Sequence, residues 1–202
     1  MSEIRVDTIT EKTSANGVAI DSVTLKDGGA TLTDNITFSA SGKGVHLGVT
    51  SATASNLLDD YEEGSFDVLV ADATSGGNTN AMTASGEVDG VYTKIGDMVY
   101  WSIAGTTNTT GLTGTNSFVL RGLPFAANNR NNFYEGMTPR FAAGNYFTLD
   151  SGHTQAHSTV ANAATWVQFY QSGSNSAVTA ILVNDVADDA GIRVQGMYHT
   201  DS

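Results

Sequence analysis

Apolar and polar residues alternate along most of this chain, and this limits the fold to β-strands more firmly than any other feature of the sequence. In the stretch DMVYWSIAG (97–105), Val99, Trp101 and Ile103 fall on one face of an extended chain. Turn signals such as Asp89-Gly90 separate runs of this kind. From residue 66 onward the candidate strands are 66–71, 91–96, 97–105, 117–123, 140–149, 165–172, 177–183 and 192–200. This spacing predicts an all-β fold in which residues 66–202 form a β-sandwich or jelly-roll-like head.

The opening segment, residues 1–50, has strong strand and turn signals but little apolar material of its own. Its only aromatic residue is Phe38. A segment this small seldom buries enough surface to fold alone, so we expect it to form an intertwined β stem with other copies of the chain. A flexible N-terminal arm is the alternative interpretation. The apolar residues predicted to lie between copies are Ile4, Val6, Val18, Ile20, Val23 and Leu25.

A third region, residues 51–65, is expected to join the stem to the head. It contains most of the stretch NLLDDYEEGSF (56–66), in which two leucines and a tyrosine stand among four carboxylates. A capping residue at the start of this stretch and a glycine near its end predict a helix of at most two turns. On that helix Leu57 and Tyr61 would share a face, with Leu58 beside them, so all three join the predicted interface between copies. A surface loop with exposed charges is the alternative.

The charge of the chain is strongly negative, with 21 acidic residues against 9 basic ones and a formal net charge of −12. This balance argues against nucleic acid as a partner, because proteins that neutralise phosphates carry clustered Lys and Arg. No run of about 18 apolar residues occurs, so no membrane insertion is expected. The N-terminus MSEIRVDTIT lacks the basic and apolar regions of a secretion signal, so we expect synthesis in a cytoplasm.

The motifs of common enzymes are missing from the sequence. With no cysteine, disulfides, thiolate metal sites and cysteine nucleophiles are all excluded. There is no GxSxG, no P-loop and no GxGxxG after a strand. The carboxylates of the junction stand too close in sequence to form the opposed pair that flanks a glycosidic bond. We therefore expect no enzymatic activity and no cofactor.

Two groups of residues have the types that bind metals, and both are better explained without a metal. His153 and His157 have the spacing of a helical metal pair, but their surroundings are rich in Gly, Ser and Thr, which favours a solvated loop. Asp185, Asp188 and Asp189 offer oxygen ligands for calcium. They lack the alternating carboxylates and distal Glu of a dedicated calcium loop, so a charged turn is favoured.

The loop AANNRNNFYE (126–135) combines amide side chains with aromatic ones. A sugar-binding surface needs a ring that covers the apolar face of the sugar and amides that pair with its hydroxyl groups. The loop is therefore a candidate sugar-binding surface, and an ordinary Asn-rich loop with buried aromatics is the alternative. The candidate contact residues are Asn129, Arg130, Asn131, Asn132 and Tyr134.

The order of several motifs resembles a family of bacteriophage tail-fibre and related virion structural proteins. The opening SEIRVDTITEKTSANGVAIDSVTLKDGGATLT resembles the first module of such proteins. The series LLDDYEEG, YTKIG and GLPF, closed by IRVQGMYHT, is similar to their second module. The resemblance covers most of the chain, and it includes no catalytic residues.

This resemblance implies a homotrimeric virion protein, bound to other virion proteins through its N-terminal segment, whose head contacts a polysaccharide or protein on the host surface. A tail fibre or tail tip is the first expectation. A capsid decoration or cement trimer that stabilises the particle is the second, and a polysaccharide depolymerase is the third.

Overall fold

The computed structural model describes residues 35–48, 51, 53, 57–129, 135–137, 140–141 and 147–201. The chain divides into two units, Met1–Ser39 and Ala40–Ser202. In the first unit only residues 35–39 are described, and these contain no helix or strand. The six interface residues predicted between Ile4 and Leu25 therefore lie outside the described residues, and of the predicted stem, residues 1–50, only 35–48 are described.

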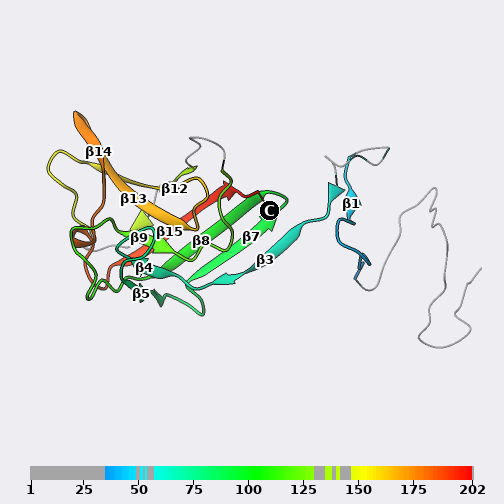
Figure 1. Ribbon diagram of the computed structural model, residues 1–202, viewed down its shortest axis with the longest axis horizontal. Coiled ribbons are helices and arrows are strands. Elements are labelled where there is room, and N and C mark those ends of the chain that lie inside the picture. Colours follow the sequence, from blue (N-terminus) through cyan, green and yellow to red (C-terminus); the bar gives the residue numbers. More distant parts are fainter. Residues whose placement is uncertain are drawn as a thin grey trace, which may run out of the picture. The chain divides into compact units, whose positions relative to one another are not determined.

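The second unit is built from antiparallel strands, which confirms the predicted all-β fold (Figure 1). One of its two large sheets has seven strands and the other has six. The seven-stranded sheet runs in the order β10 (Glu135–Met137), β12 (Gln155–Val160), β13 (Trp166–Gly173), β9 (Val119–Arg121), β4 (Leu69–Ala71) and β5 (Thr79–Ala81), with β14 (Ser176–Ala180) also paired to β13. The six-stranded sheet runs in the order β11 (Arg140–Phe141), β15 (Gly191–His199), β8 (Met98–Thr106), β7 (Gly90–Ile95) and β3 (Tyr61–Phe66), with β6 (Thr83–Ala84) also paired to β8.

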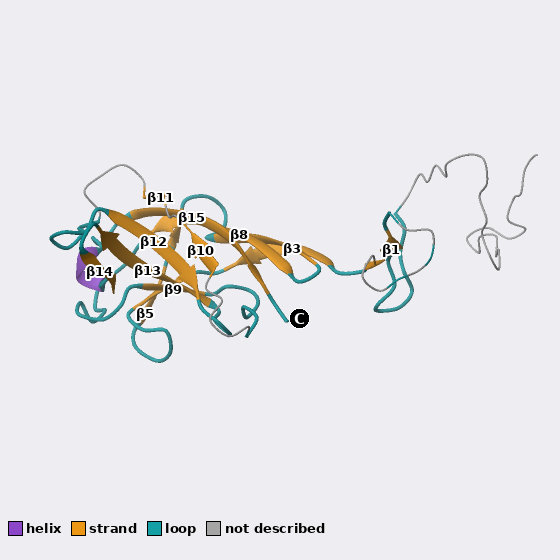
Figure 2. Cartoon of the chain, turned by 90° about the horizontal axis from the view of Figure 1, so that it is seen from above, coloured by secondary structure: helices purple, strands orange, loops and turns teal. Residues whose placement is uncertain are grey.

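Two smaller elements complete the described structure. Strands β1 (Val45–His46) and β2 (Leu57–Leu58) pair with each other alone. A single 3-10 turn, η2 (Val183–Asp185), is the one helical element among the described residues and is drawn in purple in Figure 2.

The two large sheets share one apolar core, as expected for a sandwich. The six-stranded sheet contributes Val99, Trp101 and Ile103, the face predicted from the alternation in β8, and all three are buried. From the seven-stranded sheet, Leu120 and Phe169 are completely buried. Because the long strands β8, β13 and β15 bury alternate residues, the second face of each sheet is left to solvent or to a partner.

The predicted helix at the junction is wrong. Leu57 and Leu58 instead pair with β1, and the six residues of β3 pair one by one with those of β7. An isolated helix of two turns is unstable in water, since nucleation costs more than its few hydrogen bonds return. A strand at the edge of a large sheet instead gains a complete ladder with its neighbour, and this outweighs the local capping signal.

Candidate functional site

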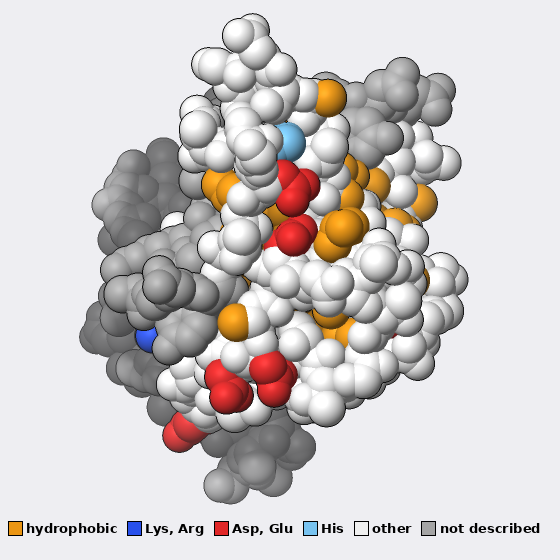
Figure 3. Space-filling view, turned by 90° about the vertical axis from the view of Figure 1, so that its left-hand side faces the viewer, with side chains coloured by type: hydrophobic (Ala, Val, Ile, Leu, Met, Phe, Trp, Pro, Cys, Tyr) orange, Lys and Arg blue, Asp and Glu red, His pale blue; other side chains and the backbone are white. Residues whose placement is uncertain are grey.

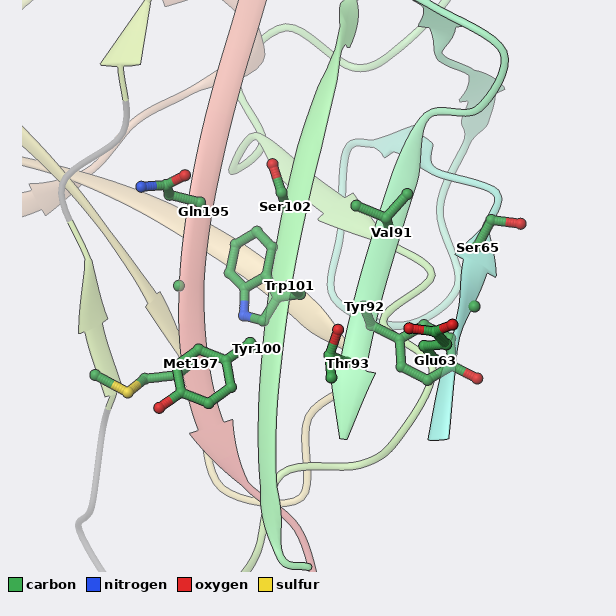
Figure 4. Close-up of a pocket in the computed structure, with 12 residues that line it drawn as sticks. Glu63, Ser65, Val91, Tyr92, Thr93, Tyr100, Trp101, Ser102, Gln195 and Met197 are labelled. Carbon is green, nitrogen blue, oxygen red and sulfur yellow. The ribbon is translucent and has the colours of Figure 1, made fainter. Parts of the chain in front are cut away.

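The most distinctive surface of the head is the outer face of the six-stranded sheet, which faces away from the core. We define this outer face by the residues of alternating position on its four long strands, several of which Figure 4 labels. On β3 these residues are Tyr61, Glu63 and Ser65, and on β7 they are Val91, Thr93 and Ile95. On β8 they include Tyr100 and Ser102, and on β15 they are Arg193, Gln195 and Met197.

The strand register arranges these side chains in rows across the sheet. One row reads Glu63, Thr93, Tyr100 and Met197. The next reads Ser65, Val91, Ser102 and Gln195. Neighbouring strands lie about 4.8 Å apart, so each row is a continuous line of contact that crosses four strands. The rows border a shallow, open hollow of about 1020 Å³.

Large apolar side chains are concentrated on the outer face. Tyr61 is 59% exposed, Tyr100 50%, Val91 and Met197 47% each, and Ile95 45%. Only four other large apolar side chains between residues 57 and 129 or 147 and 201 are as much as 37% exposed, and none of them belongs to the outer face: Leu58, Leu69, Val88 and Val178. Single exposed apolar side chains are ordinary, but a contiguous group of them marks a surface that contacts a partner.

The charges of the outer face lie at its two sides. On the β3 side, the Glu63 carboxylate accepts a hydrogen bond of 2.8 Å from the Tyr61 hydroxyl, and this bond raises the pKa of the Tyr61 phenol. On the opposite side, Arg193 of β15 is exposed, and its register partner in β11 is Arg140. The centre of the face, around Tyr100 and Ser102, carries no formal charge.

A buried lysine holds the edge strand that supplies the acidic side. Lys94 of β7 is 3% exposed, and its ammonium group forms an ion pair with Asp60, just before β3. The same ammonium lies 5.5 Å from the centre of the Phe125 ring, which adds a cation–π contact. The backbone N–H of Gly96 donates to the Asp60 carbonyl at 2.8 Å. These contacts fix the start of β3 against the turn that follows β7.

The aromatic rings around this lysine join distant parts of the chain. Tyr92 meets Phe125 edge to face, with ring centres 5.4 Å apart. The buried Tyr198 hydroxyl donates to the Phe125 carbonyl at 2.8 Å, and burial raises the pKa of this phenol. Each of the four motifs supplies one residue to this group: LLDDYEEG supplies Asp60, YTKIG supplies Lys94, GLPF supplies Phe125 and IRVQGMYHT supplies Tyr198. The motifs that carry the family resemblance therefore form a packing cluster, and none of these four residues is part of the outer face.

The loops at one end of the head are held by carboxylates. Asp72 is buried and accepts hydrogen bonds from the Asn78 N–H at 2.7 Å and the Thr113 N–H at 2.8 Å. The Thr113 N–H has the largest effect, and together these hydrogen bonds lower the pKa of Asp72 to about 2 in spite of its burial. Asp188 accepts from the Thr109 N–H at 2.8 Å. Because protein donors occupy these oxygens, the carboxylates stabilise the loops.

The carboxylates considered for calcium do not form a metal centre in the described structure. Asp185 accepts a hydrogen bond of 2.8 Å from the Leu182 N–H, and Asp188 and Asp189 lie in the turn before β15, as the charged-turn interpretation predicts. Across the described ranges, no three His, Asp or Glu side chains gather in a way that could hold a metal ion. Figure 3 views the end of the head at which β14 lies and shows acidic side chains there, with a basic one only at its margin.

The sequence favours a solvated loop for the histidine pair, and the structure differs from this at His157. His157 lies within β12 and stacks on Tyr170 of β13, with ring centres 5.6 Å apart and planes 16° from parallel. His153 lies in the turn before β12, where its Nε2 atom is 2.9 Å from the Ala177 carbonyl oxygen. The two histidines thus have separate structural contacts.

The other predicted contact residues have different outcomes. Leu58 is 39% exposed, and Tyr61, also predicted to lie between copies, belongs to the outer face. Asn129 is exposed, and its N–H donates to the Asp201 carboxylate at 3.0 Å. The other four candidate contact residues of this loop lie outside the described residues: Arg130, Asn131, Asn132 and Tyr134.

Sequence reasoning missed most of the outer face, including Val91, Thr93, Tyr100, Gln195 and Met197. A local signal was present for Tyr100, which is a large aromatic residue on the polar side of the alternation in β8. The register that aligns it with Met197 and Glu63 is formed between strands far apart in sequence.

Comparisons with known proteins assign no family to the chain. No protein-family model matches it, and no curated protein matches it either. The resemblance to tail-fibre proteins thus stays a prediction. Among the described residues, no helix has the length and apolarity needed to cross a bilayer.

Proposed function

We propose that this chain is a non-enzymatic, homotrimeric structural protein of a phage particle, a tail fibre or tail tip that contacts the host surface. The observation that carries the proposal is the outer face. Five large apolar side chains, each about half exposed, lie together on one side of the head, and such a surface is typical of a protein that works in contact with others.

The order of the sequence motifs supports the same proposal from a second direction. The motifs come in the order seen in tail-fibre proteins, and residues from four of them pack together around Lys94 and Phe125. The motif residues serve packing, and the exposed apolar surface is the outer face of a sheet. This combination suits an assembly or adhesion protein. The N-terminal segment would attach the head to other virion proteins, and the loop at 126–135 remains our candidate for the host glycan or protein.

The test of this proposal has two measurements. Native mass spectrometry of the purified full chain should give a mass of three chains, and a stable monomer would contradict the homotrimer. Labelling of intact particles should then place the protein on the tail. An icosahedral surface position would instead identify a capsid decoration trimer, and release of fragments from host polysaccharide would identify a depolymerase.

Adsorption to host cells offers a third measurement. A trimer of chains with a net charge of −12 each meets a bacterial surface that is usually anionic, so repulsion should weaken contact at low salt. We expect adsorption to rise with ionic strength or with added calcium. Adsorption that stays unchanged from low to high salt would count against contact with an anionic host surface.

A further inference from the structure

The few basic residues of the head are distributed in an informative way. Within the described part of 57–201, Lys and Arg occur only at Lys94, Arg121, Arg140 and Arg193. Lys94 is buried in its pair with Asp60, and Arg121 donates to the carbonyl oxygens of Ala73 and Gly76. Arg193 of β15 is exposed, and its backbone register partner in β11 is Arg140.

The guanidinium group of Arg193 has no hydrogen bond or ion pair with any described residue. In a chain with 21 acidic residues, this exposed positive charge at one side of an apolar face suits an acidic partner.

The opposite side of the same sheet is acidic. Strand β3 is the edge strand and carries Glu62 and Glu63, with Glu63 on the outer face. Strands β7 and β8 separate β3 from β15, so Glu63 and Arg193 of one copy lie at least about 14 Å apart and cannot pair with each other. Each side of the face therefore has the charge that the other side needs, and only a second copy can bring the two together.

We propose that further copies of this chain cover the outer face, with the β3 side of one copy against the β11–β15 side of the next. The contact between Glu63 and Arg193 is then repeated at every interface. The apolar centre, with Tyr100 and Met197, faces inward. The proposal rests on the homotrimer of the proposed function, and it assigns the threefold contact to the head.

The charge pattern selects this arrangement over a contact between identical sides. Two β3 sides brought together would oppose glutamate with glutamate, and two β15 sides would oppose arginine with arginine. A contact between unlike sides is heterologous, and it closes into a ring when each copy is rotated by the same angle. Glu63 and Arg193 lie two rows apart along the strands, so neighbouring sheets must cross at an angle, as twisted sheets do.

Chemical cross-linking tests the contact in the full chain, which has no native cysteine. The variant carries both Glu63→Cys and Arg193→Cys, and a short bismaleimide that spans the length of an Arg–Glu pair is added to it. A denaturing gel should show a band of three linked chains. Each single variant should give no linked product, because the two cysteines come from different sides of neighbouring copies.

Two further variants keep the test decisive. Ser65→Cys with Gln195→Cys places the cysteines on the outer face one row along from Glu63, and it should link three chains in the same way if the first pair disturbs folding. Leu69→Cys with Val178→Cys is the control, because both residues are exposed on the seven-stranded sheet and should give no linked product.

The outcomes separate this inference from the proposed function. Native mass of three chains without linkage by either outer-face pair would overturn the inference and leave the homotrimer standing. This is the result expected if a glycan, another virion protein or the N-terminal segment covers the face. Linked dimers from a single variant would show contact between identical sides and also overturn it. A monomeric wild-type protein would overturn both.

Discussion

The ion pair between Lys94 and Asp60 should respond very unequally to loss of its two partners. Lys94 is 4% exposed at its side chain, whereas the side chain of Asp60 is 42% exposed. Asp60→Asn leaves a buried ammonium group without its counter-charge. Lys94→Met removes the buried charge and leaves a carboxylate that can turn to water. We therefore expect Asp60→Asn to be the more destabilising change.

The burial of the two groups sets the size of the effect. Loss of one partner from a fully buried pair costs about 3–5 kcal/mol, because the remaining charge is uncompensated. Solvent at Asp60 screens the pair, so we expect a cost of about 2 kcal/mol for Asp60→Asn. Replacement of a buried charge by an apolar side chain of similar volume is often close to neutral, and loss of the cation–π contact with Phe125 adds about 0.5–2 kcal/mol. Lys94→Met should therefore cost about 1 kcal/mol.

Urea unfolding at neutral pH and one fixed protein concentration measures both costs, since assembly makes stability depend on concentration. The double variant Asp60→Asn with Lys94→Met should be no less stable than Asp60→Asn alone. The control is Asp59→Asn, an exposed neighbour that should change stability by less than about 0.5 kcal/mol. A larger loss for Lys94→Met than for Asp60→Asn would refute the role of Asp60 as the counter-charge.

Three other residues give further predictions. The pKa of Asp72 is lowered from 3.8 to about 2, so the ionised Asp72 carboxylate contributes fully to the stability of the fold above pH 3.8, and this contribution is lost as the pH falls through about 2. Acid unfolding followed by circular dichroism should show this loss of stability, and the Asp72→Asn variant should lack the pH dependence that Asp72 causes. Tyr198→Phe removes the hydrogen bond to the Phe125 carbonyl and should cost about 1 kcal/mol in urea unfolding, and an unchanged midpoint would show that the bond contributes nothing. Gly122→Ala should lower the melting temperature, because Gly122 has a φ of +117° and an added Cβ would lie 2.1 Å from the Asp67 carbonyl oxygen. A variant with the melting temperature of the wild type would contradict this close approach.

The sequence predicted the fold class well because strand periodicity is a local property. The face of Val99, Trp101 and Ile103 could be identified from β8 alone, and it is buried as expected. Strand β12 was missed, because Gln155–Val160 is rich in polar residues and owes its strand structure to pairing with β13 and β10. The helix predicted around Leu57 failed for the same reason, since pairing with distant strands outweighed a local signal.

The candidate site was much less accessible from the sequence. The partner of Lys94 lies 34 residues away in the chain, and nothing in the spacing identifies Asp60 among four neighbouring carboxylates. The outer face unites residues from positions 61 to 197, and its apolar character emerges only when β3, β7, β8 and β15 are placed in order. Strand order depends on the free energy of the whole fold, which a local pattern does not contain.

The pairing of β15 with β8 has a consequence for how quickly the head can form. Gly191 pairs with Thr106 and His199 pairs with Met98, at separations of 85 and 101 residues, whereas β7 and β8 are joined by the two residues at 96–97. A hairpin of the β7–β8 kind closes in about 1–10 μs, while topologies rich in such long-range pairing fold in milliseconds to seconds. During that interval the unpaired edge of β8 is open to a β15 strand from any neighbouring chain. Dilute refolding should therefore favour intact heads, and concentrated refolding should favour heads that have exchanged their last strand.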